Sequence, residues 1–167
     1  MNVDLAALIL RVALGTVMFA HGWNHTFRGG RLPGVARWFS SIGFRAPKLQ
    51  AALASYTELA VGPMLVAGIL TPLAAAGVVG VMLVALVSNH FKNGYFIFRP
   101  GEGYEYVLTL LLTAIALGAL GAGSWSVDGA IGFDADGWGG LAIAAGLGGG
   151  LGLATLAAFW RPGNRAA

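Results

Sequence analysis

Five stretches of this chain are strongly apolar and long enough to cross a lipid bilayer as helices. A helix needs about 20 apolar residues to span the hydrocarbon core of a membrane. Charged residues make up only 10% of the 167 residues, whereas about 25% is usual for a soluble domain. The predicted spans are residues 5–23, 51–70, 73–91, 104–121 and 139–160. We therefore expect an all-α protein, a polytopic bundle of membrane helices.

The charges between the predicted spans indicate the orientation of the chain. Residues 24–50 carry five basic residues and no acidic one, whereas residues 122–138 carry three aspartates and no basic residue. Loops rich in Lys and Arg stay on the cytoplasmic side, so five spans place the N-terminus outside and the C-terminus in the cytoplasm. The start, MNVD, lacks the positive charge of a signal peptide, and Arg11 interrupts the apolar run. We therefore expect the first span to be retained.

The composition also excludes several kinds of chemistry. The net charge of +3 comes from basic residues in the loops between spans, with no basic patch, so we expect no nucleic-acid partner. The chain has no cysteine. This absence excludes disulfide exchange, thiolate zinc sites and iron–sulfur ligation by this chain.

Glu58 stands out because it lies within an apolar segment in which the next charge is Lys92. A charge at the centre of a bilayer costs about 2.5–3.5 kcal/mol on insertion scales and usually faces a protein interior or a wet cavity. The predicted topology brings further polar side chains to the same depth on four helices. These residues are His21, His25, Tyr56, His90 and Glu105.

Three roles are open for Glu58 at this stage. It is a buried structural partner of His21 or of a tyrosine, a proton-transfer group beside a quinone or another redox ligand, or a metal ligand. The metal alternative would use His21, His25, His90 or Glu105, since His and Glu bind zinc and iron. No tight two-ligand motif such as Glu-x-x-His is present, so we predict no metal site.

Three other features have two interpretations each. Arg11 either reaches the outer interface or pairs with Asp4 or Asp128, or else it is a cationic anchor in a central cavity. Residues 35–42 have helical apolar spacing and form a short helix that either lies on the inner leaflet or covers the inner mouth of the bundle. In the last span, Gly146/Gly150 and Gly148/Gly152 allow close helix contact, either within this chain or with another copy.

Several short motifs together resemble the DoxX family of small bacterial membrane proteins. They are RVALG at 11–15, FAHG at 19–22, Glu58 before Gly62, GILTP at 68–72, NG at 93–94, GYE at 103–105 and GSWSVD at 123–128. The resemblance implies a four-helix membrane domain over residues 1–128 in a bacterial inner membrane. Residues 129–167 then add an acidic outer loop, a fifth membrane helix and a short basic tail.

The resemblance also implies a redox-linked role, because the family resembles subunits of thiosulfate:quinone and quinol oxidoreductases. Our leading interpretation is a membrane subunit that binds a quinone in an inner-side polar cavity, with other membrane or redox proteins as partners. Glu58 would exchange a proton, and His21 would orient it or bind a quinone carbonyl. His25, Tyr56, His90 and Glu105 would complete the quinone site. The alternative is a non-enzymatic membrane scaffold or assembly factor with a structural polar cluster, so the sequence leaves open whether the chain is catalytic.

Overall fold

The computed structural model describes residues 2–133 and 135–162, which form a bundle of helices. In this part of the chain the strand geometry is limited to one isolated bridge, between Phe44 and Trp160. The prediction of an all-α fold is confirmed. The α-helices are α1 (Asn2–Phe27), α2 (Arg31–Ser41), α3 (Pro47–Ala67), α4 (Thr71–Ala85), α5 (Glu105–Leu120), α6 (Val127–Ile131), α7 (Gly137–Leu141) and α8 (Gly148–Phe159). Single turns of other helix types are η1 (Leu86–His90), η2 (Phe91–Asn93) and η3 (Ala142–Leu147).

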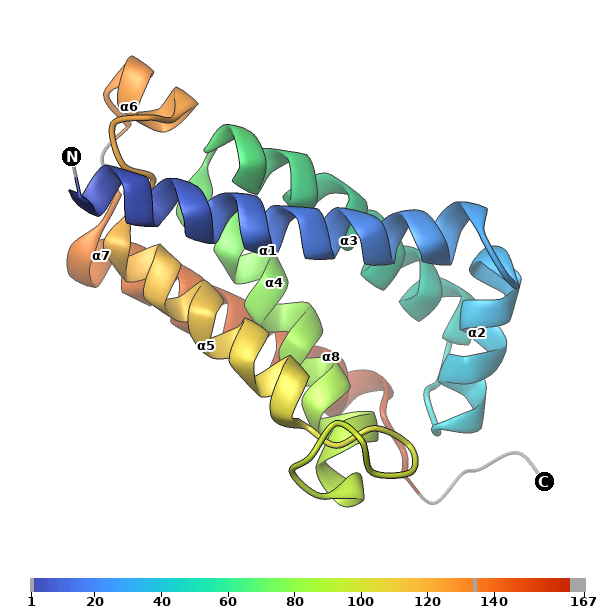
Figure 1. Cartoon of the computed structure of the whole chain (residues 1–167). Helices are drawn as coiled ribbons and strands as arrows, with labels where there is room; N and C mark the ends of the chain where they lie inside the picture. Colours follow the sequence, from blue (N-terminus) through green and yellow to red (C-terminus); the bar gives the residue numbers. More distant parts are fainter. Residues whose placement is uncertain (1, 134, 163–167) are drawn as a thin grey trace.

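The helices form two groups that diverge from one end of the molecule (Figure 1). Helix α1 packs most extensively against α3, whereas α4 packs against α5 and α8. The groups lie closest where α1 begins, beside α6 and α7, and we call this the N-terminal end. They separate towards α2, and we call that the α2 end.

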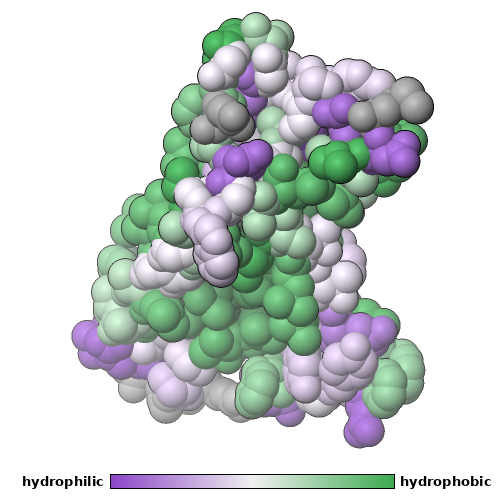
Figure 2. Space-filling model, turned by 90° about the vertical axis from the view of Figure 1, so that its left-hand side faces the viewer, coloured by the Kyte–Doolittle hydropathy of each residue, from purple (hydrophilic) through white to green (hydrophobic). Residues whose placement is uncertain are grey.

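Length and hydropathy single out three helical segments that can cross a membrane within residues 2–133 and 135–162. They are Asn2–Phe27, Thr71–Asn93 and Gly137–Phe159, and the apolar α5 is shorter. Hydrophobic side chains cover much of the molecular face in Figure 2, and hydrophilic ones lie mainly towards its margins. These features agree with a membrane helix bundle, and the count of five crossings stays a prediction. Part of the predicted 129–167 segment, residues 134 and 163–167, lies outside the described residues.

Helix α3 differs from its predicted limits at both ends. It begins at Pro47, because proline suits the first turn of a helix, and it continues through Pro63. It ends at Ala67, three residues before the predicted end, because Gly68 takes a left-handed conformation with φ of 68°. A side chain at Gly68 would also collide with the Arg11 guanidinium. Glycine is therefore required here for both conformation and space.

A buried polar junction holds the N-terminal end together. The fully buried Arg11 donates hydrogen bonds to the carbonyls of Val66 and Trp125. Asp128 accepts bonds from the backbone N–H groups of Leu70 and Thr71, at 2.7 and 2.8 Å, and so caps the start of α4.

Of the two predicted roles for Arg11, the structure supports the structural one, although the arginine is buried instead of reaching the interface. Asp128 attracts Arg11 electrostatically. The carboxylate of Asp4 accepts from the backbone N–H of Ser124. Arg11 therefore stabilises this end mainly through hydrogen bonds to main-chain carbonyls.

Helix α2 covers the α2 end of the bundle. Its Phe39 is buried, and both Trp38 and Phe39 line the space beneath it. The chain after α2 is fixed to the end of α8, because Trp160 Nε1 donates to the Ile42 carbonyl and Arg161 N donates to the Gly43 carbonyl, each at 2.9 Å. The structure therefore favours the covering role over a helix that packs only on lipid.

The glycines of the last span divide into two sets. A Cβ on Gly148 would clash with Ala76 of α4, and a Cβ on Gly152 would lie 3.1 Å from the Gly80 carbonyl oxygen. Gly146 and Gly150 have open space around them. One predicted glycine pair therefore serves contact within the chain, and a homo-oligomer through the other pair stays a prediction.

Candidate ligand-binding cavity

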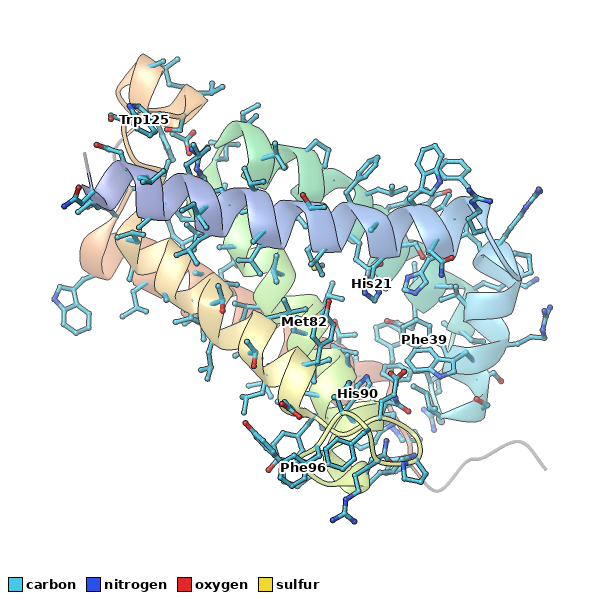
Figure 3. The ribbon with its side chains drawn as sticks, in the orientation of Figure 1. His21, Phe39, Met82, His90, Phe96 and Trp125 are labelled. Atoms are coloured by element: carbon cyan, nitrogen blue, oxygen red, sulfur yellow. The ribbon has the colours of Figure 1, made fainter. Side chains whose placement is uncertain are left out.

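A cavity of about 1140 Å³ occupies the space between the two helix groups at the α2 end. Its size compares with roughly 300–1,000 Å³ for typical small-molecule sites. Side chains from six helices line it, namely α1, α2, α3, α4, α5 and α8. His21, Phe39, Met82 and His90 lie around this space and come from four different elements (Figure 3). The cavity therefore depends on the whole fold.

The cavity wall is amphipathic. Its apolar part includes Val17, Met18, Trp38, Phe39, Met82, Leu110 and Leu151. Its polar part includes His21, Asn24, His25, Gln50, Thr57, Glu58, Ser88, Asn89, His90, Glu102 and Tyr106. Mostly apolar walls with a few convergent polar groups are typical of sites for small organic molecules.

Glu58 is buried against His25 on the wall of this cavity. The Glu58 Oε2 atom lies 2.8 Å from His25 Nδ1, and the side chains are 4% and 30% exposed respectively. Gly22 makes this approach possible, because a Cβ there would lie 2.6 Å from the backbone nitrogen of Leu59. The close crossing of α1 and α3 thus positions the imidazole of α1 on the carboxylate of α3.

The partner of Glu58 is His25, whereas the structural alternative proposed from the sequence named His21 or a tyrosine. His21 and His25 lie one turn apart on the same face of α1, with ring centroids 6.0 Å apart. Hydrogen bonding engages His25 Nδ1 and leaves Nε2 of that ring for another partner. The pair is therefore a carboxylate–imidazole unit with one free ring nitrogen.

His21 of α1 lies beside Tyr106 of α5 on the wall of the cavity. Its ring centroid is 6.4 Å from that of Tyr106 on α5. Both side chains line the cavity, and both are exposed. Figure 3 shows His21 pointing from α1 towards α5. The wall between α1 and α5 is therefore formed in part by exposed aromatic side chains.

His90 also lines the cavity, as part of the π-helical turn η1. Its Nδ1 donates to the Glu102 carbonyl, at 3.0 Å. The side-chain amide of Asn93 donates to the carbonyls of Gly101 and Glu102, so the loop 94–104 is folded back on this turn. In the neutral form of the ring, the second nitrogen of His90 is a hydrogen-bond acceptor.

Two of the predicted site residues lie outside the cavity. Tyr56 is 53% exposed, because it precedes Glu58 by two residues and so lies about 200° around the helix. The Glu105 carboxylate accepts from the backbone N–H of Ile97, at 3.1 Å, and orders the preceding loop. The structure thus brings together His21, His25, Glu58 and His90, and their binding role stays a prediction.

Several polar cavity residues are absent from the predicted site, among them Asn24, Gln50 and Tyr106. Asn24 lies within one turn of both His21 and His25, so helical spacing could have found it. Gln50 precedes Glu58 by eight residues and lies on a similar side of α3, but the predicted span began only at residue 51. Within residues 2–133 and 135–162, no group of three or more His, Asp or Glu side chains is arranged to hold a metal ion.

Comparison with known proteins gives one finding. A family model described as DoxX matches residues 6–91, which is more than half of the chain. The match covers α1 to α4 and includes His21, His25, Glu58 and His90. No curated protein and no solved structure matches the chain. The part of the motif pattern beyond residue 91 stays a resemblance.

Proposed function

The chain belongs to the DoxX family of integral membrane proteins, and we propose that it is the membrane subunit of a redox-linked complex that binds a quinone in the cavity. One observation carries this proposal. A buried carboxylate, Glu58, is paired with the imidazole of His25 on the wall of an amphipathic cavity within a membrane bundle. Buried ionisable residues in membrane helices commonly mark ligand or proton pathways.

The cavity wall fits the chemistry of a quinone. A quinone has an apolar ring and tail and two carbonyl oxygens that accept hydrogen bonds. Phe39, Met82 and Leu110 offer apolar surface, and the amide of Gln50 and the protonated form of the His25 ring offer N–H donors. We propose that a quinone dissolved in the bilayer enters between α1 and α5, beside the exposed side chains of His21 and Tyr106.

Glu58 and His25 would hold and move a proton beside the bound ring. A quinone supplies electron transfer that is coupled to proton uptake and release. The pair holds a proton between Glu58 Oε2 and His25 Nδ1, and the free Nε2 can exchange a proton with a ligand oxygen. Because the chain has no cysteine for an iron–sulfur centre or a redox disulfide, we assign the electron partner to another protein.

The alternative function is a membrane scaffold or assembly factor. The observation that favours it is the pairing of Glu58 itself, because a carboxylate already bonded to His25 requires no ligand. In that case the pair would serve only to hold α1 on α3, and its removal would unfold the bundle.

Quinone that co-purifies with the protein tests the two functions. We expect extraction of the purified wild type to release quinone in a fixed ratio to protein. Glu58→Gln should lose the quinone and remain folded. Glu105→Gln is the matched control, since that carboxylate lies outside the cavity, and it should retain the quinone. A quinone-free wild type, or full retention by Glu58→Gln, would contradict the proposal, and unfolding of Glu58→Gln would favour the scaffold.

A further inference from the structure

Gln50 is a buried cavity residue whose amide donor has no partner within residues 2–133 and 135–162. It lies in the first turns of α3, is 3% exposed and lines the cavity. Its Nε2 atom makes no hydrogen bond to any described residue. A buried donor without an acceptor is destabilising, and the large majority of buried polar side-chain atoms are paired. The unpaired amide therefore requires an explanation.

Three other polar groups of the same cavity are hydrogen-bonded within the chain. The Ser88 hydroxyl donates to the Val84 carbonyl at 2.7 Å. Glu58 is bonded to His25, and His90 is bonded to the Glu102 carbonyl. Gln50 differs from these three residues, because its side chain lines the cavity and its buried Nε2 atom has no acceptor among the described residues.

The surroundings of Gln50 suit a flat ring compound. Trp38 and Phe39 of α2 line the cavity with it, with their ring centroids 5.0 Å apart. Phe39 also packs in one apolar cluster with Ala51, the residue after Gln50. Gln50 precedes Glu58 by eight residues on α3, which corresponds to about 12 Å along the helix axis. It is therefore a polar position in the cavity that is separate from Glu58.

We propose that Gln50 is a ligand-binding residue whose amide donates a hydrogen bond to a carbonyl or ether oxygen of the bound compound. This inference rests on the quinone function proposed above. It gives Gln50 a role in specificity, because an acyl chain of a membrane lipid has no acceptor to offer and would leave the donor unpaired. A site built to hydrogen-bond its ligand rejects analogues that lack the matching group.

Titration of decylubiquinone into the purified protein tests this role. Gln50→Met keeps the length of the side chain and removes the donor, so affinity should fall by about tenfold, the loss of one hydrogen bond. Without ligand, Gln50→Met should unfold at the same temperature as the wild type or higher, because an unpaired buried donor is gone. Ser55→Ala is the matched control, since Ser55 is also buried and unpartnered on α3 but does not line the cavity. Its affinity should equal that of the wild type.

The outcomes separate this inference from the function on which it rests. If the wild type binds and Gln50→Met binds equally well, Gln50 is not a ligand contact and the quinone site still stands. If the wild type does not bind, the quinone function and the role of Gln50 fall together. Gln50→Leu serves as a second apolar replacement. Unfolding of both apolar variants would assign Gln50 a structural role and overturn the inference.

Discussion

The two ends of this bundle both bury charged side chains, but they satisfy them in different ways. At the N-terminal end, Arg11 and Asp128 bond to main-chain carbonyls and N–H groups of the turns that join the helices. At the α2 end, Glu58 bonds to the His25 side chain, beside a cavity in which the Gln50 Nε2 atom has no partner among the described residues. The first arrangement fixes the turns that join the helices. The second leaves polar side chains on the wall of the cavity.

This difference distinguishes structural burial from burial that suits binding. Breaking a buried charged interaction by removing one partner is strongly destabilising, by roughly 3–5 kcal/mol. That cost should be fully expressed where the partners are main-chain groups, since these cannot move without moving the helices. It should be smaller where the partner is a single imidazole that can change its protonation.

The largest effect is expected from Asp128→Asn. The amide would place an N–H group against one of two backbone donors and would remove the attraction for Arg11. We expect a loss of about 3 kcal/mol or more, measured as a lower unfolding midpoint in detergent. Asp136→Asn is the matched control, because Asp136 is exposed at the same end, and it should change little. Equal unfolding midpoints for the two variants would contradict the structural role of Asp128 at the N-terminal end.

A smaller effect is expected from Gly22→Ala, which tests how the cavity pair is positioned. A methyl group there would meet Leu59 N at 2.6 Å and force α1 away from α3. Overpacking of this kind costs roughly 1–3 kcal/mol. Gly150→Ala is the control, because its Cβ would meet open space, and it should stabilise the helix by about 0.5–1 kcal/mol. Thermal unfolding of both variants is the measurement, and a neutral Gly22→Ala would show that the close crossing is not required.

The smallest effect on stability is expected from Glu58→Gln. The glutamine carbonyl can still accept a hydrogen bond from His25 Nδ1, so one bond of the same geometry remains. We expect a loss of about 1 kcal/mol, within the usual range for one hydrogen bond. The unfolding midpoint of this variant, compared with that of Asp128→Asn, checks the ranking. A loss as large as that of Asp128→Asn would support the scaffold function.

The sequence predicted at which end of the bundle the cavity residues lie. It did not predict which way each side chain points around its helix. Apolar spans of bilayer length and their connecting loops were enough to bring His21, His25, Glu58 and His90 to one end of the bundle. The rotation of each helix about its axis depends on packing, so Tyr56 was assigned to the site although it lies on the exposed side of α3. The choice of His25 over His21 also followed from packing, through the close contact at Gly22.

The connections were harder to predict, because they depend on contacts between residues far apart in sequence. Glu105 was predicted to join the site, but its carboxylate bonds to the Ile97 backbone in a loop that precedes it. Arg11 and Asp128 are separated by more than a hundred residues. Their role depends on the folded contact between the α3–α4 turn and the start of α6. Residue types alone do not reveal such main-chain partners.

The most direct test of the difference between the two ends is one thermal unfolding experiment. The wild type, Glu58→Gln and Asp128→Asn would each be unfolded with and without saturating decylubiquinone. A ligand that binds only the folded state raises the unfolding midpoint. The account predicts that Asp128→Asn unfolds early but keeps its quinone-induced rise, whereas Glu58→Gln unfolds near the wild type and loses that rise. An unchanged rise in Glu58→Gln, or no rise in the wild type, would contradict it.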